Sequence, residues 1–362
     1  MGYIVTPLVA PYTIWLTRGP FSTATSLGLH LGWFEQAFAQ EGFQVSALQD
    51  SRDAMMRVQH VHHTIKTLIR EGGNVLPIWQ RARRLTQDGR DNTVVVGFTG
   101  LDEVEVLLAR PGAGLRPHDP SSLKGKRLGL PKAAGDIDVW RAMSLRAFDT
   151  ALKAGGLAFD DVVLTNVAAP PIQWQGRRRP GGGLQVTQDA LLSGEVDVIF
   201  AKGAEAIALQ ETHELEVVLD FSRLEDPAWR VNNGAPRPIT VHRHLLNDNP
   251  DLVATYLRVL IAVAGWARSH PGEVAEVIAA DTGLPVETVR RGHGRRLSES
   301  LDVNLDAARL GGLQSQVDFL HRQGLTDKRF DVEAWIDPAP LRAALAEPLS
   351  LNGSTWQTNL TS

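Results

Sequence analysis

The stretch from 60 to 79 contains residue types that bind anions and move protons. Its basic side chains lie close together in the sequence: His60, His62, His63, Lys66 and Arg70. The guanidinium of Arg70 presents a planar fork of donors that suits a carboxylate, sulfinate, sulfonate or phosphate, and His60 is able to exchange a proton near neutral pH. The pair Gly72-Gly73 permits positive φ and lets main-chain N–H groups approach a ligand closely. We therefore predict an anion-binding loop with an acid/base group beside it.

Two other interpretations of the same stretch stay open. Residues 64–70 could form a short surface helix with a basic face that ends at a glycine. His60, His62 and His63 could bind a metal ion, although no nearby pattern of carboxylates supports such a site. We expect no metal and no cofactor.

The composition is that of an ordinary soluble globular protein. The 362 residues are 43 % hydrophobic and 22 % charged, with a formal net charge of −4. This length allows two domains with substantial cores, and the charge gives no global field that favours nucleic acid or an anionic membrane. The chain has no cysteine, which excludes disulfides, thiolate metal sites and a cysteine nucleophile.

The N-terminus does not resemble a secretory leader. Residues 1–11 lack the basic region and the sustained apolar core of a signal peptide. We expect a cytoplasmic protein if the sequence is complete, and a periplasmic or extracellular one if a leader has been removed. No apolar run approaches the ~20 residues that a membrane helix needs, so we expect no membrane insertion.

Strands and helices alternate along most of the chain. Strands are predicted at 13–17, 43–48, 92–98, 103–110, 126–131, 161–167, 197–200, 215–221 and 238–241. Helices are predicted at 22–40, 140–154 and 188–192, and the last third is helical after the cap at Asn249-Pro250. Ligands of open α/β sheets bind beyond the carboxyl ends of strands, so we expect the strand ends at Gly19, Gly100, Pro131 and Gly203 to line a cleft.

This pattern predicts an α/β protein with a type II periplasmic-binding-protein-like fold: two αβ lobes, a ligand cleft between them, and C-terminal helices. Lobe 1 is expected to be discontinuous, at 1–116 plus 222–350, because the strand at 238–241 should return to the first sheet. Lobe 2 is expected at 117–221, after a turn-rich segment. Residues 351–362 lack periodicity and are predicted to be a disordered tail.

Several motifs resemble the sulfonate/nitrate/thiamine-precursor group of substrate-binding proteins. They are Ser121–Pro131, Leu192–Phe200, and Asn249–Val253 with Trp266–Pro271. The resemblance implies the same fold and a small anionic organic ligand. It implies an ABC permease as partner only if the protein is secreted.

A narrower resemblance is to the 2′-hydroxybiphenyl-2-sulfinate desulfinase family, which has this fold and hydrolyses an aryl C–S bond. His60, Arg70 and Gly72-Gly73 match that family's catalytic histidine, sulfinate-binding arginine and glycine loop without a gap. Asp138-Val-Trp140-Arg141 resembles its Asp-Pro-Trp-Arg segment, and Phe330–Pro338 resembles its C-terminal segment. The resemblance therefore implies that His60 is catalytic and that Arg70 holds the ligand.

One departure from the family concerns its active cysteine, which lies in a Cys-Pro sequence after the first strand. The matching position here is Gly19, in Gly19-Pro20. Ser22 and Thr23 lie nearby but are weak nucleophiles without a base, and we expect them to cap a helix. An enzyme built on this chain needs chemistry without a thiol.

Two functions follow as hypotheses. A desulfinase-like enzyme would hold an aryl sulfinate with Arg70 and the Gly72-Gly73 amides, while His60 or a water that it orients supplies a proton to the ring. A non-catalytic binding protein would need only the anion loop, hinge closure and an aromatic wall. The candidate wall residues are Trp15, Phe21, Trp140 and Trp229, although each tryptophan is by default a core residue. We expect a monomer in either case.

Overall fold

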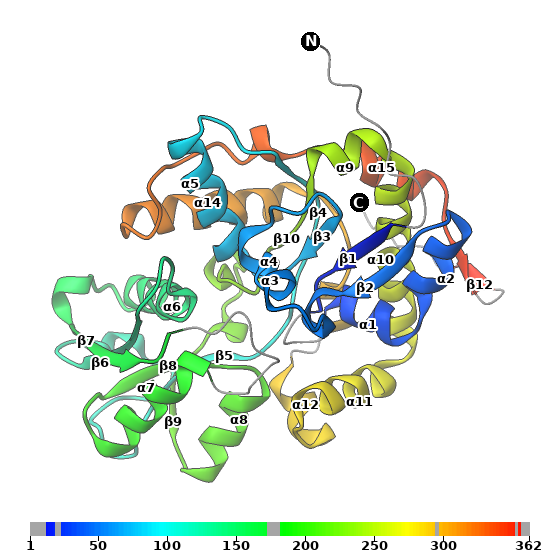
Figure 1. Ribbon diagram of the computed structural model, residues 1–362. Helices are drawn as coiled ribbons and strands as arrows, with labels where there is room; N and C mark the ends of the chain where they lie inside the picture. Colours follow the sequence, from blue (N-terminus) through cyan, green and yellow to red (C-terminus); the bar gives the residue numbers. More distant parts are fainter. Residues whose placement is uncertain (1–11, 19–22, 172–181, 294–296, 352–353, 356–362) are drawn as a thin grey trace.

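The computed structural model describes residues 12–18, 23–171, 182–293, 297–351 and 354–355. Two five-stranded sheets organise it, with strand orders β2-β1-β3-β10-β4 and β7-β6-β8-β5-β9. The first sheet lies to the upper right in Figure 1 and the second to the lower left. Helices pack on both, which confirms the predicted α/β fold with two lobes.

Polar residues lie at one end of the central strands of the first sheet. Its strands are β1 (Thr13–Leu16), β2 (Gln44–Ala47), β3 (Leu68–Glu71), β4 (Thr93–Thr99) and β10 (Arg237–His242). β10 runs antiparallel to both β3 and β4, so it begins where they end. Glu71, Thr99 and Arg237 therefore meet at one edge. The strand predicted to return to the first sheet does so.

Helices of the first lobe bury the other strand residues. They are α1 (Ala24–His30), α2 (Trp33–Gln40), α9 (Arg243–Asp248), α10 (Pro250–Ser269), α11 (Pro271–Thr282), α12 (Val286–Gly292), α13 (Leu297–Ser300) and α15 (Ala339–Ala346). The single helix predicted at 22–40 is divided in two, because Gly32 adopts φ of 68° and a left-handed residue interrupts the helical path. Thr23 caps α1 through its side chain, as expected.

Helix α10 corrects one expectation about membranes. By length and composition, α10 could cross a bilayer, with a mean hydropathy of 1.3, although no such run was expected. However, 83 % of that apolar window is buried inside the protein. Tyr256, Leu257 and Leu260 on this helix are fully buried in the core of the first lobe. We conclude that α10 is a core helix.

The second sheet contains a strand that was expected in the first lobe. Its strands are β5 (Glu105–Ala109), β6 (Arg127–Ala133), β7 (Val163–Ala169), β8 (Val198–Lys202) and β9 (Glu216–Asp220), with α6 (Val139–Ala154), α7 (Gly182–Ser193) and α8 (Gly203–Thr212) around them. β5 pairs antiparallel with β8 and β9. The chain therefore crosses between sheets at 100–104, before the expected boundary at 117. The sequence of β5 indicates a strand but does not indicate which of the two sheets the strand joins. The division of the chain into lobes otherwise stays a prediction.

A second core joins the two lobes. The remaining helices are α3 (Ala54–Arg57), α4 (Gln59–His62), α5 (Val75–Gln87) and α14 (Ala307–Arg322). Ile78 of α5, Phe148 of α6 and Phe319 of α14 are fully buried in one hydrophobic cluster. α5 therefore packs toward both the first sheet and the second lobe, and the loop that starts it lies between them.

Part of the predicted disordered tail is ordered. Ser350–Leu351 (β11) and Ser354–Thr355 (β12) pair as antiparallel strands. The two residues between them in the sequence are Asn-Gly, a pair typical of short hairpin turns, which a search for periodicity does not detect. The rest of 352–362 lies outside the described residues.

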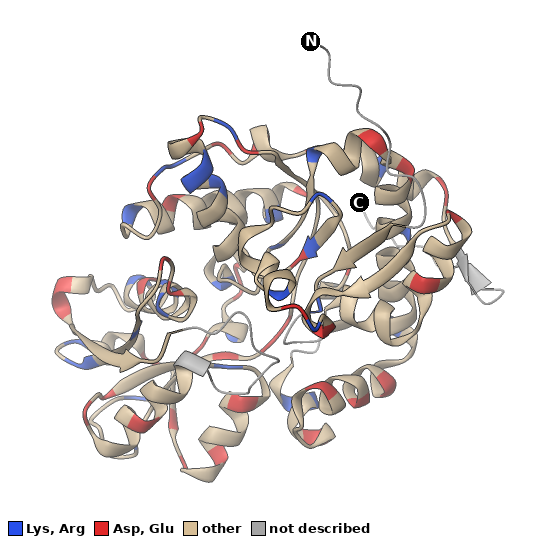
Figure 2. Cartoon of the chain, viewed as in Figure 1, with Lys and Arg blue, Asp and Glu red and all other residues tan. Residues whose placement is uncertain are grey.

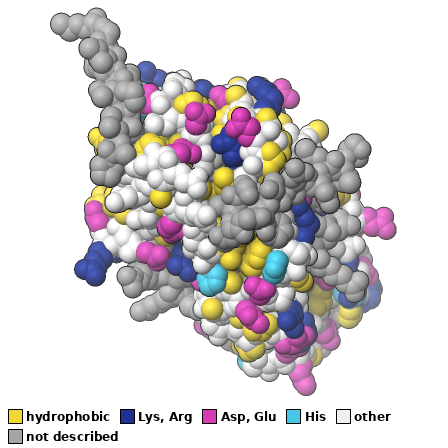
Figure 3. Space-filling view, turned by 90° about the vertical axis from the view of Figure 1, so that its right-hand side faces the viewer, with side chains coloured by type: hydrophobic (Ala, Val, Ile, Leu, Met, Phe, Trp, Pro, Cys, Tyr) yellow, Lys and Arg dark blue, Asp and Glu magenta, His cyan; other side chains and the backbone are white. Residues whose placement is uncertain are grey.

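Charged residues are distributed over both lobes. Figure 2 shows acidic and basic residues scattered over both lobes, and the face drawn in Figure 3 mixes acidic, basic and apolar side chains. This distribution agrees with the small net charge of −4.

Candidate anion-binding site

The candidate site is built where β3 ends and α5 begins. Arg70 lies in β3, a strand whose four residues are all buried, and only 2 % of its surface is exposed. Its Nε donates to the backbone carbonyl of His60 at 2.9 Å and its Nη2 to that of Gly73 at 3.3 Å. The structure therefore brings together His60, Arg70 and the Gly-Gly pair, as the spacing predicts.

The guanidinium of Arg70 is buried, and none of its hydrogen bonds among the described residues goes to a carboxylate. Its Nη1 is buried and has no hydrogen-bond partner among the described residues. Burial, and then the nearby charge of Arg237, lowers the pKa of Arg70 to about 9. An unpaired buried cation is costly, so the site is suited to an anion that supplies the missing charge.

The two glycines are required for close approach rather than for positive φ. Neither Gly72 nor Gly73 has positive φ, which corrects that part of the prediction. A Cβ on Gly72 would lie 3.2 Å from Cζ of Arg70, and one on Gly73 would lie 2.6 Å from Cγ of Asn233. A side chain at either position would therefore displace the arginine or the asparagine that forms the site.

The N-terminus of α5 adds a fixed positive potential. This helix begins at Val75, immediately after Gly73 and Asn74. Asn233 satisfies two of its first amides: the Asn74 N–H donates to the Asn233 carbonyl at 3.1 Å and the Val75 N–H to its Oδ1 at 3.0 Å. The start of a 13-residue helix therefore lies just after Gly73, and the positive end of a helix dipole favours an anion.

His60 is a neutral imidazole at physiological pH. Burial lowers its pKa well below 6.5, and the positive charges of Arg70 and Arg237 lower it further. Its ring therefore lies among cations in the unprotonated form. It is suited to hydrogen bonding or to accepting a proton, and poorly suited to donating one from an imidazolium.

Arg237 is a member of the site that sequence analysis missed. It begins β10, is 4 % exposed, and its buried Nε has no hydrogen-bond partner among the described residues. Burial lowers its pKa, against the opposing effects of Glu71 and Glu103. The available signal was a cation inside an apolar strand, Arg-Pro-Ile-Thr-Val. Nothing local connects that strand with Arg70.

Glu71, next to Arg70, has a structural role. It is fully buried, and its carboxylate accepts hydrogen bonds from the Thr25 hydroxyl and the Thr99 hydroxyl, both at 2.5 Å. The Thr25 hydroxyl also lies 2.6 Å from that of Tyr256. Glu71 therefore holds the ends of β3 and β4 in place, and its hydrogen bonds leave it unavailable to neutralise Arg70 directly.

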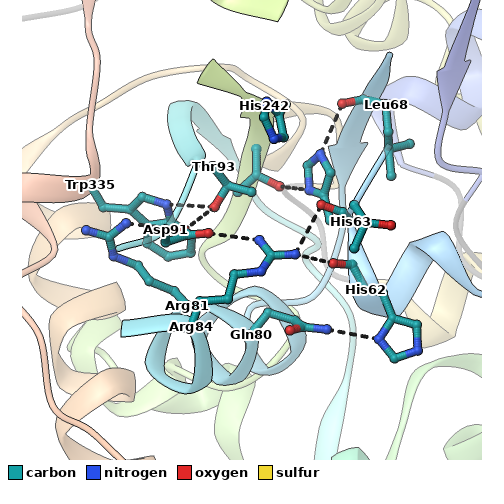
Figure 4. A network of polar contacts seen from close by, with 12 residues as sticks. His62, His63, Leu68, Gln80, Arg81, Arg84, Asp91, Thr93, His242 and Trp335 are labelled. Carbon is teal, nitrogen blue, oxygen red and sulfur yellow. Dashed lines mark hydrogen bonds and ion pairs between the residues drawn. The ribbon is translucent and has the colours of Figure 1, made fainter. Parts of the chain in front are cut away.

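A polar network between α4 and α5 holds α4, the helix that carries His60, in place (Figure 4). Arg84 of α5 donates to the carbonyls of His62 and His63 and pairs with Asp91 at 2.8 Å. Arg81 also pairs with Asp91, at 3.3 Å. This buried pairing holds the end of α4 against α5.

The other two histidines in the stretch belong to that network. His62 Nδ1 lies 3.2 Å from Gln80 Nε2, whereas His63 lies 3.1 Å from the Leu68 carbonyl and 3.3 Å from the Thr240 hydroxyl (Figure 4). Burial, followed by Arg70 and Arg84, lowers the pKa of His63 to about 3. No group of three or more potential metal ligands occurs within the described part of the chain.

A separate cavity of about 590 Å³ lies beside this network, lined by His63, Arg84 and His242 among others. His242 ends β10, so the cavity is at the sheet edge opposite to Arg237. It is therefore distinct from the candidate anion site.

The predicted aromatic wall is placed only in part. Trp15 is half-buried in β1, and its register opposite Leu68 puts it on the sheet face that also carries Arg70. Trp140 is half-buried in the first turn of α6 and packs against the second core. Trp229 is 36 % exposed. Gly19 and Phe21 lie outside the described residues. The ligand-binding role of all these residues stays a prediction.

Two segments that carried the family resemblance have structural roles. Asp138 caps α6 by accepting from the Arg141 N–H at 2.9 Å. Trp335, in the C-terminal segment, donates to the Thr93 hydroxyl at 3.3 Å and packs against the Arg81 guanidinium, 5.2 Å from its ring centre.

Comparison with known proteins confirms the predicted resemblance. No protein-family model matches the chain. The 2′-hydroxybiphenyl-2-sulfinate desulfinase of Rhodococcus erythropolis is 26 % identical over 285 residues, which cover 69 % of this chain and 75 % of that protein. The protein of the same name from Rhodococcus qingshengii gives the same values.

Solved structures show the same fold. A Cys-to-Ser mutant of the desulfurization enzyme DszB, in complex with biphenyl-2-sulfinic acid, aligns with a TM-score of 0.71 and 22 % identity, covering 92 % of this chain and 99 % of that one. A putative periplasmic sulfonate-binding protein SsuA from Methylobacillus flagellatus aligns with a TM-score of 0.70 and 18 % identity, covering 98 % and 100 %. The fold is therefore that of periplasmic sulfonate-binding proteins and of DszB.

Proposed function

We propose that the chain binds the acidic group of a small aromatic or organic acid, a sulfinate, sulfonate or carboxylate, at Arg70. The observation that carries this proposal is the buried Nη1 of Arg70, which has no partner within the described residues. The similarity to a sulfinate desulfinase and to sulfonate-binding proteins supports the same class of ligand.

The site offers three kinds of positive potential to such an anion. Arg70 supplies its charge and the unused donor Nη1, and Arg237 adds a second buried guanidinium close enough to lower the pKa of Arg70. The start of α5 at Val75, just after Gly72-Gly73, supplies the helix dipole. A tetrahedral or planar oxyanion with two or three oxygens matches this arrangement better than a single-point acceptor.

We propose further that the bound acid is desulfinated, as a hydrolase acting on a C–S bond. The ring carbon gains a proton and loses SO₂, so that ArSO₂⁻ and H⁺ give ArH and SO₂, and water then converts SO₂ to bisulfite with return of the proton. No thiol takes part, because Gly19 stands where the resemblance places the family cysteine. Neutral His60 would hydrogen bond to the sulfinate or to the water, and the enzyme would act as a cytoplasmic monomer without cofactor.

A receptor is the second candidate. The SsuA likeness extends over 98 % of the chain, and a binding protein needs neither a thiol nor a proton donor. In that case the protein would act outside the cytoplasm and deliver its ligand to an ABC permease.

Binding and turnover are tested separately. Calorimetry with 2′-hydroxybiphenyl-2-sulfinate and with a sulfonate analogue should show binding to the wild type. Arg70→Ala should lose about 1.5–3 kcal/mol, roughly 10- to 150-fold in Kd, and Arg70→Lys should recover little because an ammonium cannot reproduce the fork. Arg329→Ala, which removes a mostly exposed arginine that pairs with Asp318, is the matched control.

Single-turnover incubation, assayed for sulfite and for product mass, then decides between enzyme and receptor. Sulfite release by the wild type supports the desulfinase, and tight binding without any product supports the receptor. Gly19→Cys restores a thiol at the position that the family uses. If that variant is active and the wild type is inert, the native reaction has been lost. Unchanged affinity in a folded Arg70→Ala variant would refute the binding site itself.

A further inference from the structure

A buried cluster of three charged residues lies where the chain crosses between the sheets. Glu105 begins β5 and is in register with Lys202, the last residue of β8. Lys202 forms an ion pair with Glu103, and the side chains of both are buried, at 6 % and 1 % exposure. Two carboxyl groups therefore share one ammonium group.

The ammonium of Lys202 forms an ion pair with Glu103 and also acts on Glu105 through its charge. Its Nζ donates to Glu103 Oε1. The second oxygen of Glu103, Oε2, is buried and has no hydrogen-bond partner among the described residues. The charge of Glu103 in this ion pair opposes ionisation of Glu105. His293 and Arg237 also face Glu103, and both feel its charge.

The surroundings of Glu105 favour its protonated form. Burial is the largest cause and Glu103 adds to it, while Lys202 and a hydrogen bond from Asn232 oppose them; together they raise the pKa of Glu105 to about 8. The side chain nevertheless retains partial solvent exposure. At neutral pH it is a carboxylic acid that is able to release a proton.

This cluster lies next to the anion loop. The Asn233 side chain contacts Gly73 and caps α5. Gly234, the next residue, with its Cα about 3.8 Å away, faces both carboxyl groups: a Cβ there would lie 3.2 Å from Glu103 Oε1 and 4.0 Å from Glu105 Oε1. Asn233 therefore contacts Gly73, and the adjacent Gly234 lies beside Glu105.

Among the described residues of the site, neither His60 nor Glu71 is a suitable acid. Arg70 and Arg237 help keep His60 unprotonated, and Glu71 is held by threonine hydroxyls. Protonation of an aryl carbon needs a group that carries its proton at working pH. Among the described residues beside the loop, Glu105 meets that condition.

We propose that Glu105 is the acid that protonates the ring carbon of a sulfinate held by Arg70, an inference that rests on the proposed desulfinase function. The O–H bond of Glu105 breaks as the ring C–H bond forms, and the electron pair of the C–S bond becomes that C–H bond while SO₂ leaves. Glu105 is left as a carboxylate, paired through Lys202. Hydration of SO₂ to bisulfite releases the proton that restores it.

The test compares Glu105→Gln with Glu216→Gln, which makes the same change on β9 of the same sheet, at the end of β5 away from Glu105. With 2′-hydroxybiphenyl-2-sulfinate as probe, Glu105→Gln should lower the single-turnover rate by about 100-fold or more, with Kd at pH 7 within a few fold. Wild-type rate should fall as pH rises through about 8 or above, since a bound anion raises the Glu105 pKa further. Glu216→Gln should retain rate and profile.

Ligand binding as a function of pH distinguishes an acid role of Glu105 from a purely structural role. The affinity of a non-reacting sulfonate should weaken in the wild type as pH rises through about 8, because ionised Glu105 repels the anion. Glu105→Gln should lose that step and keep only the weakening near pH 9 that deprotonation of Arg70 causes in both proteins. If the wild type turns over and Glu105→Gln is equally fast with an unchanged pH profile, the inference is overturned while the proposed function stands. If the wild type is inert, whether or not Gly19→Cys is active, the desulfinase proposal fails for this chain, and the inference fails with it.

Discussion

The Nε of Arg70 donates to the backbone carbonyl of His60 at 2.9 Å. This bond ties the end of β3 to the short helix α4, and it explains why a spacing of ten residues can define a site. It uses the carbonyl of His60 and not the imidazole ring, whose pKa is lowered by burial and by the charges of Arg70 and Arg237. The histidine would therefore be an uncharged neighbour of the proposed anion rather than its counterion.

The charge state of His60 can be measured directly. NMR titration of the histidine ring protons should give His60 a pKa well below 6.5, because of burial, Arg70 and Arg237. Arg237→Gln should raise that pKa, since removing a nearby positive charge stabilises the imidazolium. His60→Gln identifies the resonance. A His60 pKa that does not move in Arg237→Gln would contradict the placement of Arg237 in the site.

Gly73 should not tolerate a side chain. Gly73→Ala would place Cβ 2.6 Å from Asn233 Cγ, so Asn233 must withdraw from the start of α5. We expect a loss of about 1–3 kcal/mol in unfolding free energy and weaker binding of the sulfonate probe, measured by denaturant titration and calorimetry. Gly311→Ala is the control, because its Cβ meets nothing within 4 Å in α14, and it should stabilise the helix by about 0.5–1 kcal/mol. Equal effects of the two substitutions would argue against a close approach at Gly73.

The elements were largely predictable because their signals are local. The buried run of β4 and the Asn249-Pro250 start of α10 lie within a few residues of the structure that they specify. The proximity of Arg70 to His60 was expected, but the hydrogen bond to the His60 carbonyl was not. The choice of sheet for β5 was not, because an apolar strand between two turns fits either neighbour.

The missing members of the site come from distant parts of the chain. Asn74 hydrogen bonds to the Asn232 carbonyl across 158 residues, and Arg237 reaches Arg70 only because β10 inserts between β3 and β4. Local patterns carry no information about such pairings. The Gly-Gly signal was detected for the wrong reason, since it reflects the proximity of Asn233 and Arg70 rather than positive φ.

The loss of folding stability at low pH should arise in part from Asp91, which pairs with Arg81 and Arg84. Burial would raise the pKa of Asp91, but hydrogen bonds from Thr93 and Arg84 outweigh it and lower the pKa below 3.8. A carboxylate with a lowered folded pKa stabilises the protein above its unfolded pKa, and this contribution is lost as pH falls through the folded value.

Asp91→Asn should therefore flatten the fall of unfolding free energy below about pH 4, and should cost about 3–5 kcal/mol near pH 7 because Arg81 and Arg84 lose a buried partner. Asp136→Asn is the control: that carboxylate is 67 % exposed beside Arg83, and its loss should change stability by less than about 0.5 kcal/mol. Denaturant titrations from pH 3 to 7 measure both. If the unfolding free energy of Asp91→Asn falls as steeply below about pH 4 as that of the wild type, this explanation is ruled out.

The protonation of Glu105 should also be visible without any ligand. Its folded pKa of about 8 lies above the ordinary value of 4.5, so the folded chain holds a proton that the unfolded chain releases. The resulting stabilisation is fully present below about pH 4.5 and is lost as pH rises to about 8. Glutamine cannot titrate, so Glu105→Gln should become more stable relative to the wild type between pH 5 and pH 9. Thermal melts of both proteins, with Glu216→Gln as the control, should diverge over that range, and parallel curves would mean that Glu105 is already ionised at neutral pH.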